Sequence, residues 1–256
     1  NRDPRVVPIL DGRAAPPSLS REGIELFECA TKVKEFRDAD EVARLYPLEI
    51  ETFIRRLTGA DAVVLMGPAI LRFGERSPEA GSRDNSNAAR LVHIDTSDSA
   101  ALQFAQASAP AGGRSIRRIA QHNLWRTFSG APQDVPLAVC DARSVAPEDL
   151  VPAEAMFDRD GKVVWSLEAL LLHYNPAHRW IYFPNMTRDE VIVFKRHDTD
   201  PHEPRLVPHS AFTDARVPAG CAPRASVEVD IDRLLSSIGA RRAHRGAAGL
   251  ARLGCP

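Results

Sequence analysis

Short apolar runs, bounded by Pro, Gly, Asp and Asn, dominate residues 90–232. They are rich in β-branched and aromatic residues, which favour extended strands over helices. Many short strands separated by such turn residues are typical of a sandwich or a jelly roll. The runs that we expect to form strands are RLVHID (90–95), HNLWRTF (122–128), PLAVCDA (136–142), RWIYFP (179–184), EVIVFKR (190–196) and ASVEVDI (225–231).

A different periodicity occupies residues 38–57, where apolar side chains recur mostly every three or four positions. This spacing predicts an amphipathic helix that is interrupted by Pro47 and stopped by Gly59. We expect one further helix in the region of Ile116. The polar stretch 77–89 predicts a loop, which could serve as a lid over a site that follows it.

These patterns predict one domain with a sizeable core, since the chain has 256 residues. We expect a mainly β fold with flanking helices, an α+β class, over residues 1–232. Its first part, about 1–88, is expected to be an elaboration of strands and a helix. Residues 233–256 are rich in Arg and Ala and are expected to form a helix or a tail.

Composition and charge limit the partners that we expect. The formal net charge of −1 gives no overall attraction to nucleic acid or to an anionic membrane. No apolar run approaches the roughly 20 residues of a membrane helix, and the N-terminal residues lack the apolar core of a signal peptide. The four cysteines are widely spaced without a CxxC pair, so we expect free thiols and a cytoplasmic location.

Three residues point to a metal site: His93, Asp95 and the distant His209. Residues i and i+2 of a strand project from one face, so a His-x-Asp pair can offer two ligands to one ion. Two histidines and one carboxylate form the facial triad that holds non-haem Fe(II) and leaves coordination positions open. We therefore predict these three residues as the metal ligands of a catalytic centre.

A second cluster of possible metal ligands gives weaker support for a metal site. Pro201 and Pro204 mark residues 197–202 as a loop after a strand, and we expect the acidic and histidine residues of this segment to be solvated. They are His197, Asp198, Asp200 and His202. The chain has no nucleophile elbow, phosphate-binding loop or dinucleotide fingerprint.

Arg224 and Ser226 follow His209 at a distance that fits a loop and a return onto the next strand. A planar guanidinium can bind a carboxylate through two hydrogen bonds, and Ser226 faces the same side. The pair predicts a site for a dicarboxylic 2-oxo acid, which together with O2 would fill the open positions on iron.

Several aromatic and polar residues could bind a substrate. Asn123 and Trp125 share one face of a predicted strand, whereas Arg126 lies on the other face. A pocket arginine could hold a substrate carboxylate, and a tryptophan could form a wall. The alternative is a core tryptophan beside a salt-bridged arginine. Arg72 and Tyr174 are further candidates for substrate binding.

Three segments are similar to a known family. NLWRTFSGAPQDVPLAVCDARSV (123–145), YFPNMTRDEVIVFKRHDTD (182–200) and PHSAFTD (208–214) resemble the Fe(II)/2-oxoglutarate oxygenase-like family. That family includes gibberellin-desaturase-like fungal proteins and a cephamycin-methoxylation component. The resemblance covers roughly residues 5–232. Members commonly read HNDYT where this chain reads HIDTS (93–97), so the ligand residues match and their neighbours differ.

The resemblance implies a double-stranded β-helix, a cupin-like jelly roll, in an oxygenase of secondary metabolism. It implies that His93, Asp95 and His209 bind iron. It further implies that Arg224 and Ser226 hold the distal carboxylate of 2-oxoglutarate. The NxWR motif of the family also favours a functional role for residues 123–126.

We therefore expect an Fe(II)/2-oxoglutarate-dependent dioxygenase that oxidises an unactivated C–H bond of a small metabolite. Hydroxylation, desaturation and ring formation are all compatible outcomes. An amino-acid or peptide-like substrate and a homodimer are further expectations. Two alternatives stay open: a cupin-like metalloenzyme that does not use 2-oxoglutarate, and a non-catalytic partner of a biosynthetic enzyme.

Overall fold

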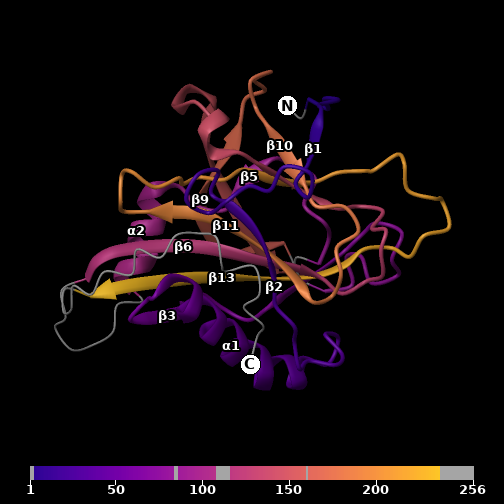
Figure 1. Ribbon diagram of the computed structural model, residues 1–256, viewed down its shortest axis with the longest axis horizontal. Helices are drawn as coiled ribbons and strands as arrows, with labels where there is room; N and C mark the ends of the chain where they lie inside the picture. Colours follow the sequence, from indigo (N-terminus) through magenta and orange to yellow (C-terminus); the bar gives the residue numbers. More distant parts are fainter. Residues whose placement is uncertain (1–2, 84–85, 108–115, 160, 237–256) are drawn as a thin grey trace.

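Two packed β-sheets form the framework of the computed structural model, which describes residues 3–83, 86–107, 116–159 and 161–236 (Figure 1). The first sheet has seven strands in the order β1 (Ile9–Asp11), β10 (Trp180–Tyr182), β7 (Leu137–Cys140), β12 (His209–Ala211), β5 (His93–Ile94), β9 (Lys162–Leu172) and β8 (Leu150–Arg159). The second has the order β2 (Ile24–Glu28), β11 (Glu190–Asp198), β6 (Ile116–Thr127), β13 (Ala225–Ser236) and β3 (Ala62–Leu65), and β4 (Ile70–Phe73) also pairs with β13.

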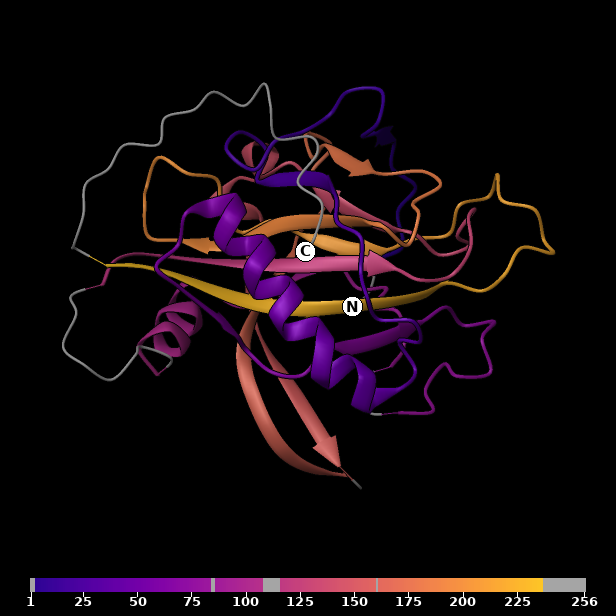
Figure 2. The same ribbon diagram turned by 60° about the horizontal axis from the view of Figure 1, so that its bottom comes forward.

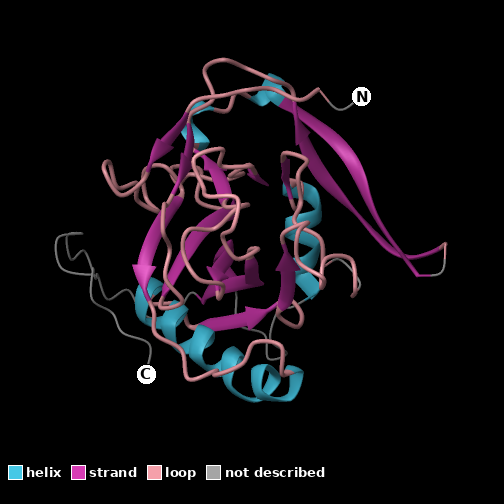
Figure 3. Cartoon of the chain, turned by 90° about the vertical axis from the view of Figure 1, so that its right-hand side faces the viewer, coloured by secondary structure: helices cyan, strands magenta, loops and turns pink. Residues whose placement is uncertain are grey.

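The inner faces of the two sheets share one buried apolar cluster. It joins Trp125 and Ile192 of the six-stranded sheet to Val139 and Ile181 of the seven-stranded sheet. Figure 3 shows the two sheets on either side of this interior, with helices on the outside. The predicted fold class, mainly β with flanking helices in a double-stranded β-helix, is confirmed.

Helix α1 (Ala39–Thr58) crosses the outer face of the six-stranded sheet (Figure 2). Its amphipathic pattern buries one face, and the side chain of Asp38 caps its N-terminus by accepting two backbone N–H groups of the first turn. Gly59 ends it with φ 65°, a left-handed conformation that glycine adopts without strain. The helix predicted over 38–57 is confirmed, but the predicted interruption at Pro47 is wrong, because the helix runs continuously through this residue.

The prediction of a helix near Ile116 is wrong. Ile116 begins β6, which pairs with β13 along almost its whole length. The second helix, α2 (Asp98–Ala107), lies before this strand, and two short 3₁₀ turns, η1 (Ala142–Ser144) and η2 (Pro147–Asp149), follow β7. The inter-strand pairing therefore decides the conformation of a segment whose local pattern was ambiguous.

Two further features of the strands differ from what the sequence predicted. β8 and β9 form an antiparallel hairpin that we did not predict, and Figure 2 shows it projecting from the rest of the molecule. β13 continues to Ser236, beyond the expected domain end at residue 232. Residues 237–256 of the predicted tail lie outside the described residues.

Cys140 and Cys221 are free thiols, as expected, but Cys29 is disulfide-bonded, so the expectation of four free thiols is wrong. Spacing along the chain does not limit which cysteines the fold brings together. None of the described helices is both long enough and apolar enough to cross a bilayer.

Truncating Phe53 is expected to destabilise the protein. Phe53 of α1 is 1% exposed, and its ring packs edge-on against Phe27 at 5.6 Å. The variant Phe53→Ala should lower the free energy of unfolding by about 3–5 kcal/mol, measured by chemical denaturation. Leu48→Ala, on the same helix but at a side chain that is 66% exposed, should change it by less than about 0.5 kcal/mol. Equal losses in the two variants would contradict the packing of α1 against the sheet.

Candidate metal centre

Two histidines meet because β12 pairs antiparallel with β5. His209 lies directly opposite His93 in this pairing, and the centres of their rings are 4.3 Å apart. Asp95 comes two residues after His93, just beyond the end of β5, and its carboxylate turns toward both imidazoles. The fold thus brings together the three residues that the sequence predicted as metal ligands.

The polar atoms of this triad converge. Oδ1 of Asp95 lies 3.3 Å from Nε2 of His93 and 3.7 Å from Nε2 of His209. One ligand atom from each residue falls within 4.8 Å of the others, so the three face one common position that could hold a metal ion. Within the described part of the chain, no other group of three His, Cys, Asp or Glu side chains is so arranged.

Backbone carbonyls orient both imidazoles. Nδ1 of His93 lies 2.7 Å from the carbonyl oxygen of Leu91, and Nδ1 of His209 lies 3.5 Å from that of Val207. A proton on each Nδ1 leaves the lone pair of Nε2 directed toward Asp95, which is the form of imidazole that binds a metal.

The protonation states of His209 and Asp95 suit a divalent cation, whereas His93 must first lose its proton. Burial lowers the pKa of His209 to about 4, so this imidazole is neutral near pH 7. Burial opposes the charge on His93, but its hydrogen bond with Asp95 raises its pKa above the usual value. Burial likewise opposes ionisation of Asp95, yet His209 and His93 hold the pKa of this carboxyl well below its usual range.

Asn123 of β6 fixes the orientation of the carboxylate. Its Nδ2 donates a hydrogen bond to Oδ2 of Asp95 at 2.7 Å, which leaves Oδ1 of Asp95 facing the two histidines. We predicted that Asn123 binds substrate, and the structure places it against a candidate metal ligand. Such outer hydrogen bonds orient metal ligands and tune their basicity.

Arg224 immediately precedes β13 and Ser226 is its second residue, and both side chains are buried. Nε of Arg224 donates to Oγ of Ser226 at 3.1 Å, and its Nη1 donates to the carbonyl of Val135 at 2.9 Å. The indole ring of Trp125 lies 5.1 Å from the guanidinium carbon. Burial lowers the pKa of Arg224 to about 10, because the charged form is desolvated.

The guanidinium of Arg224 forms no salt bridge with a carboxylate of the described residues. Its contact with Asp134 runs through its backbone N–H at 2.7 Å. A buried cation that lacks an anion is unfavourable, so a carboxylate ligand would be stabilised here. The site therefore fits one end of a dicarboxylic acid.

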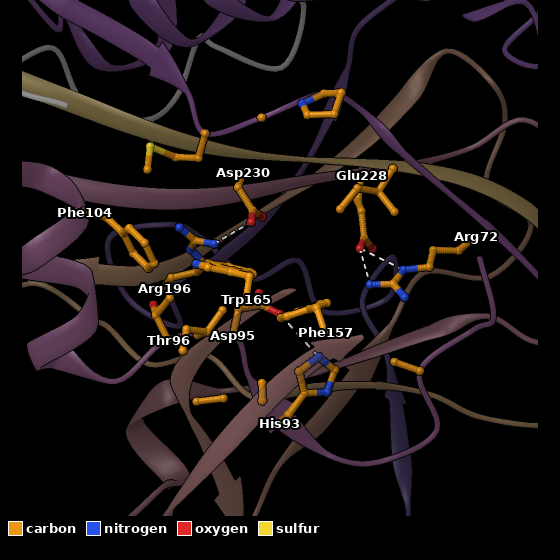
Figure 4. A pocket seen from close by; sticks show the side chains of 18 residues that line it. Arg72, His93, Asp95, Thr96, Phe104, Phe157, Trp165, Arg196, Glu228 and Asp230 are labelled. Atoms are coloured by element: carbon orange, nitrogen blue, oxygen red, sulfur yellow. Dashed lines mark hydrogen bonds and ion pairs between the residues drawn. The ribbon is translucent and has the colours of Figure 1, made fainter. Parts of the chain in front are cut away.

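A cavity of about 390 Å³ opens beside His93 and Asp95 (Figure 4). Two ion pairs line it from the six-stranded sheet: Arg72 with Glu228 at 2.7 Å and Arg196 with Asp230 at 2.7 Å. The facing lining, from α2 and the β8–β9 hairpin, is apolar and consists of Phe104, Ala155, Phe157, Trp165, Leu167 and Ala169. The volume lies within the range of small-molecule sites.

Only some of the other residues that we predicted to bind substrate lie at the cavity. Arg72 lines the cavity, whereas Arg126 lies on the outer face of β6, with its guanidinium 5.6 Å from the ring of Tyr46. The alternation that turns Trp125 inward turns Arg126 outward. Tyr174 is 51% exposed and its ring stacks with the guanidinium of Arg5, and neither Tyr174 nor Arg126 lines the cavity.

The rival group of 197–202 forms ion pairs. His197 contacts Asp98 at 2.7 Å and Asp198 contacts Arg118 at 2.6 Å. His197 and Asp198 lie at the end of β11 and are buried, so the expectation that they are solvated in a loop is wrong for them, and their ion pairs join β11 to α2 and β6.

Sequence reasoning missed part of the cavity wall. The alternating polar residues of 224–230 gave a signal for Glu228 and Asp230, because they share a strand face with Arg224. Arg196 gave none, since it lay inside a run that read as a strand. The hairpin that carries Phe157 and Trp165 was not predicted at all.

Comparison with known proteins agrees with this geometry. A family model described as "Oxidoreductase/YMDC permease-like domain" matches residues 1–231. The hydroxylase/desaturase efuI of Hormonema carpetanum is 33% identical, over 83% of this chain and 77% of its own length. The Fe(II)/2-oxoglutarate-dependent dioxygenase nvfI of Aspergillus novofumigatus is 28% identical, over 75% of this chain and 68% of its own.

A solved structure extends the similarity to three dimensions. A single-residue variant of the iron and alpha-ketoglutarate-dependent endoperoxidase NvfI superposes with a TM-score of 0.76 and 26% identity, over 89% of this chain and 82% of its own. The jelly roll and the converging His-Asp-His side chains define the class of non-haem iron oxygenases. The chain belongs to the family of Fe(II)/2-oxoglutarate-dependent oxygenases that these relatives represent.

Removing the amide of Asn123 is expected to weaken metal binding. Asn123→Ala frees the carboxylate of Asp95, so affinity for Mn(II), measured by titration and electron paramagnetic resonance, should fall about 10- to 100-fold. Asn175→Ala is a matched control, because Asn175 donates to Asp149 at 3.1 Å in another Asn–Asp pair. Unchanged affinity in Asn123→Ala would show that this hydrogen bond does not orient a ligand.

Metal affinity is also expected to fall as the pH is lowered. His93 binds a metal only when deprotonated, and its pKa is raised above 6.5, so protons begin to compete on the alkaline side of that value. His209, with a pKa of about 4, takes up no proton over the same range. Mn(II) titrations at several pH values should therefore show displacement of at most one proton per ion, which rises toward one as the pH is lowered. Displacement of two protons would contradict a neutral His209.

Proposed function

We propose that His93, Asp95 and His209 bind Fe(II), and that Arg224 and Ser226 bind the distal carboxylate of 2-oxoglutarate. The enzyme then uses O2 to oxidise a C–H bond of a small metabolite held in the adjoining cavity. Hydroxylation, desaturation and ring formation are all compatible with this arrangement. The relatives named hydroxylase/desaturase and endoperoxidase support an oxidation of this kind.

One observation carries the proposal: the buried guanidinium of Arg224 has a serine hydroxyl and a backbone carbonyl as partners, but no carboxylate among the described residues. Glu228 is the link to the metal centre. It lies two residues beyond Ser226 on β13, lines the cavity with His93, and acts electrostatically on both His93 and Arg224. A dicarboxylic acid that reaches Arg224 would therefore extend toward the triad.

When bound, Fe(II) and 2-oxoglutarate supply the oxidative decarboxylation of the oxo acid to succinate and CO2, which is coupled to a two-electron oxidation of the substrate. The residues of the chain position these groups. Arg224 and Ser226 neutralise and orient the distal carboxylate, and Asn123 keeps one oxygen of Asp95 turned toward the histidines. The apolar wall around Trp165 limits the access of water to the reacting C–H bond.

The substrate is a small molecule, consistent with the cavity and with the relatives. We further propose that the protein forms a homodimer. An amino-acid or peptide-like substrate, the class expected from the sequence, is the alternative to an uncharged, apolar one. Sedimentation and a substrate panel test these two points.

Replacing Arg224 is expected to weaken 2-oxoglutarate binding sharply. Removal of one partner of a buried charge pair costs about 3 kcal/mol or more, so Arg224→Ala should raise the dissociation constant roughly 100-fold. Anaerobic titration of the Mn(II)-loaded protein by calorimetry measures it. Arg13→Ala, which removes a half-exposed partner of Glu190, is the control and should leave binding unchanged.

A second oxo acid makes this test specific. 2-Oxobutyrate carries the same 2-oxo acid end without the distal carboxylate, so the wild type should prefer 2-oxoglutarate strongly and Arg224→Ala should lose this preference. Metal binding without any oxo acid binding would favour a cupin-like metalloenzyme of another type. Absence of metal binding would favour a non-catalytic partner protein.

A further inference from the structure

One end of the cavity beside the metal ligands carries polar groups that the protein leaves without partners. Nε of Arg196 and Oγ1 of Thr96 are buried and have no hydrogen-bond partner among the described residues. Both residues line the cavity, and both are 3% exposed. A buried polar atom without a partner is unfavourable, so each is stabilised by a ligand that offers an oxygen.

The position of Arg196 results from a β-bulge. The register between β11 and β6 shifts between Lys195 and His197, and Arg196 is the residue between them. Phe194, two residues earlier, packs against His209 with ring centres 4.8 Å apart. Bulges re-aim side chains next to active sites, and this one sends a guanidinium into the cavity close enough to act on the charge of Asp95.

The positive charge of Arg196 is already balanced by the carboxylate of Asp230. Its Nη1 lies 2.7 Å from Oδ2 of Asp230, so the pair presents a hydrogen-bond donor with little net charge. At the other end of the cavity, Arg72 is likewise paired with Glu228 (Figure 4). A ligand that satisfies Nε of Arg196 therefore needs an uncharged acceptor, because a carboxylate would meet two acidic side chains without a spare cation.

Aromatic side chains surround the same end of the cavity. Phe104 lies 6.2 Å from Trp165, and Trp165 lies 4.8 Å from Phe157, between ring centres. Figure 4 shows Phe104, Thr96 and Arg196 on the same side of Asp95. Aromatic walls of this kind favour flat or cyclic apolar groups.

We propose that Arg196 and Thr96 bind the carbonyl oxygen of an otherwise apolar, ring-containing substrate. This contact fixes which C–H bond of the ring skeleton faces the metal. Arg196 and Thr96 are thus specificity-determining residues, and Asp230 positions Arg196. The inference rests on the proposed function, since it takes the cavity as the substrate site.

Three bicyclic probes test the proposal: α-tetralone, tetralin and tetralin-1-carboxylate. They share one skeleton and carry a ketone, no oxygen and a carboxylate, respectively. Titration into the full chain loaded with Mn(II) reports binding through paramagnetic relaxation of the probe protons, and Mg(II)-loaded protein gives the background. The titrations are made with and without 2-oxoglutarate, in the absence of O2.

The wild type should bind the ketone roughly tenfold more tightly than the hydrocarbon. Arg196→Lys keeps a cation beside Asp230 but removes Nε, and Thr96→Val removes the hydroxyl at equal volume. Each variant should lower the ketone-to-hydrocarbon ratio, the double variant should bring it close to one, and all should leave tetralin affinity unchanged. Arg13→Lys, at the surface pair with Glu190, should keep the wild-type ratio.

Several results would overturn the proposal: a ratio near one in the wild type, an unchanged ratio in both variants, or tighter binding of the carboxylate than of the ketone. Failure of all three probes to approach Mn(II) up to their solubility limits would also overturn it. Ketone selectivity without any 2-oxoglutarate binding would contradict the proposed function and leave this inference standing.

Discussion

The pairing of β5 with β12 is the constraint on which the centre depends. The two strands have 2 and 3 residues, far too few to pair stably by themselves. Their register is fixed from outside, because β9 pairs with β5 and β7 pairs with β12 in the same sheet. A slip of one residue would turn one of the two imidazoles to the opposite face. The metal ligands are therefore positioned by the order of the whole seven-stranded sheet.

The six-stranded sheet supplies a different set of groups. Arg224, just before β13, and Ser226, Glu228 and Asp230 of β13 point inward, and the two carboxylates lie in ion pairs with arginines from β4 and β11. Burying this many charges is costly unless each has a partner. Arg224 is the exception, with no ion pair among the described side chains. In this inward-facing row the two carboxylates are thus paired with arginines, and Arg224 is left for a ligand.

Sequence reasoning identified those residues whose spacing along the chain is enough to predict their relative positions. The i, i+2 relation of His93 and Asp95 and the period of α1 needed no partner to be recognised. The orientation of Arg126 could not be recognised in this way. α1 covers the outer face of the six-stranded sheet, so residues on both faces of β6 are buried from Ala120 to Thr127 and the usual polar–apolar alternation is lost.

The β8–β9 hairpin was not predicted because many of its apolar side chains are exposed, whereas in β6 polar side chains are buried. Its apolar side chains are not confined to buried positions: Met156, Val163, Val164 and Trp165 are 48–62% exposed. A pattern that separates inward from outward residues cannot recognise such strands. The aromatic wall of the cavity, which depends on this hairpin, was therefore invisible in the sequence even though the metal ligands were not.

One rung of the six-stranded sheet connects the metal centre to the substrate site that we propose. Asn123 and Asp230 are direct partners in the pairing of β6 with β13. Asn123 donates to the carboxylate of Asp95, and Asp230 holds the guanidinium of Arg196. Any shift of this rung would displace the metal ligand and the proposed carbonyl donor together, so the distance between them is maintained. A reaction that must select one C–H bond depends on that distance, because the rate falls steeply when the reacting atoms are misplaced.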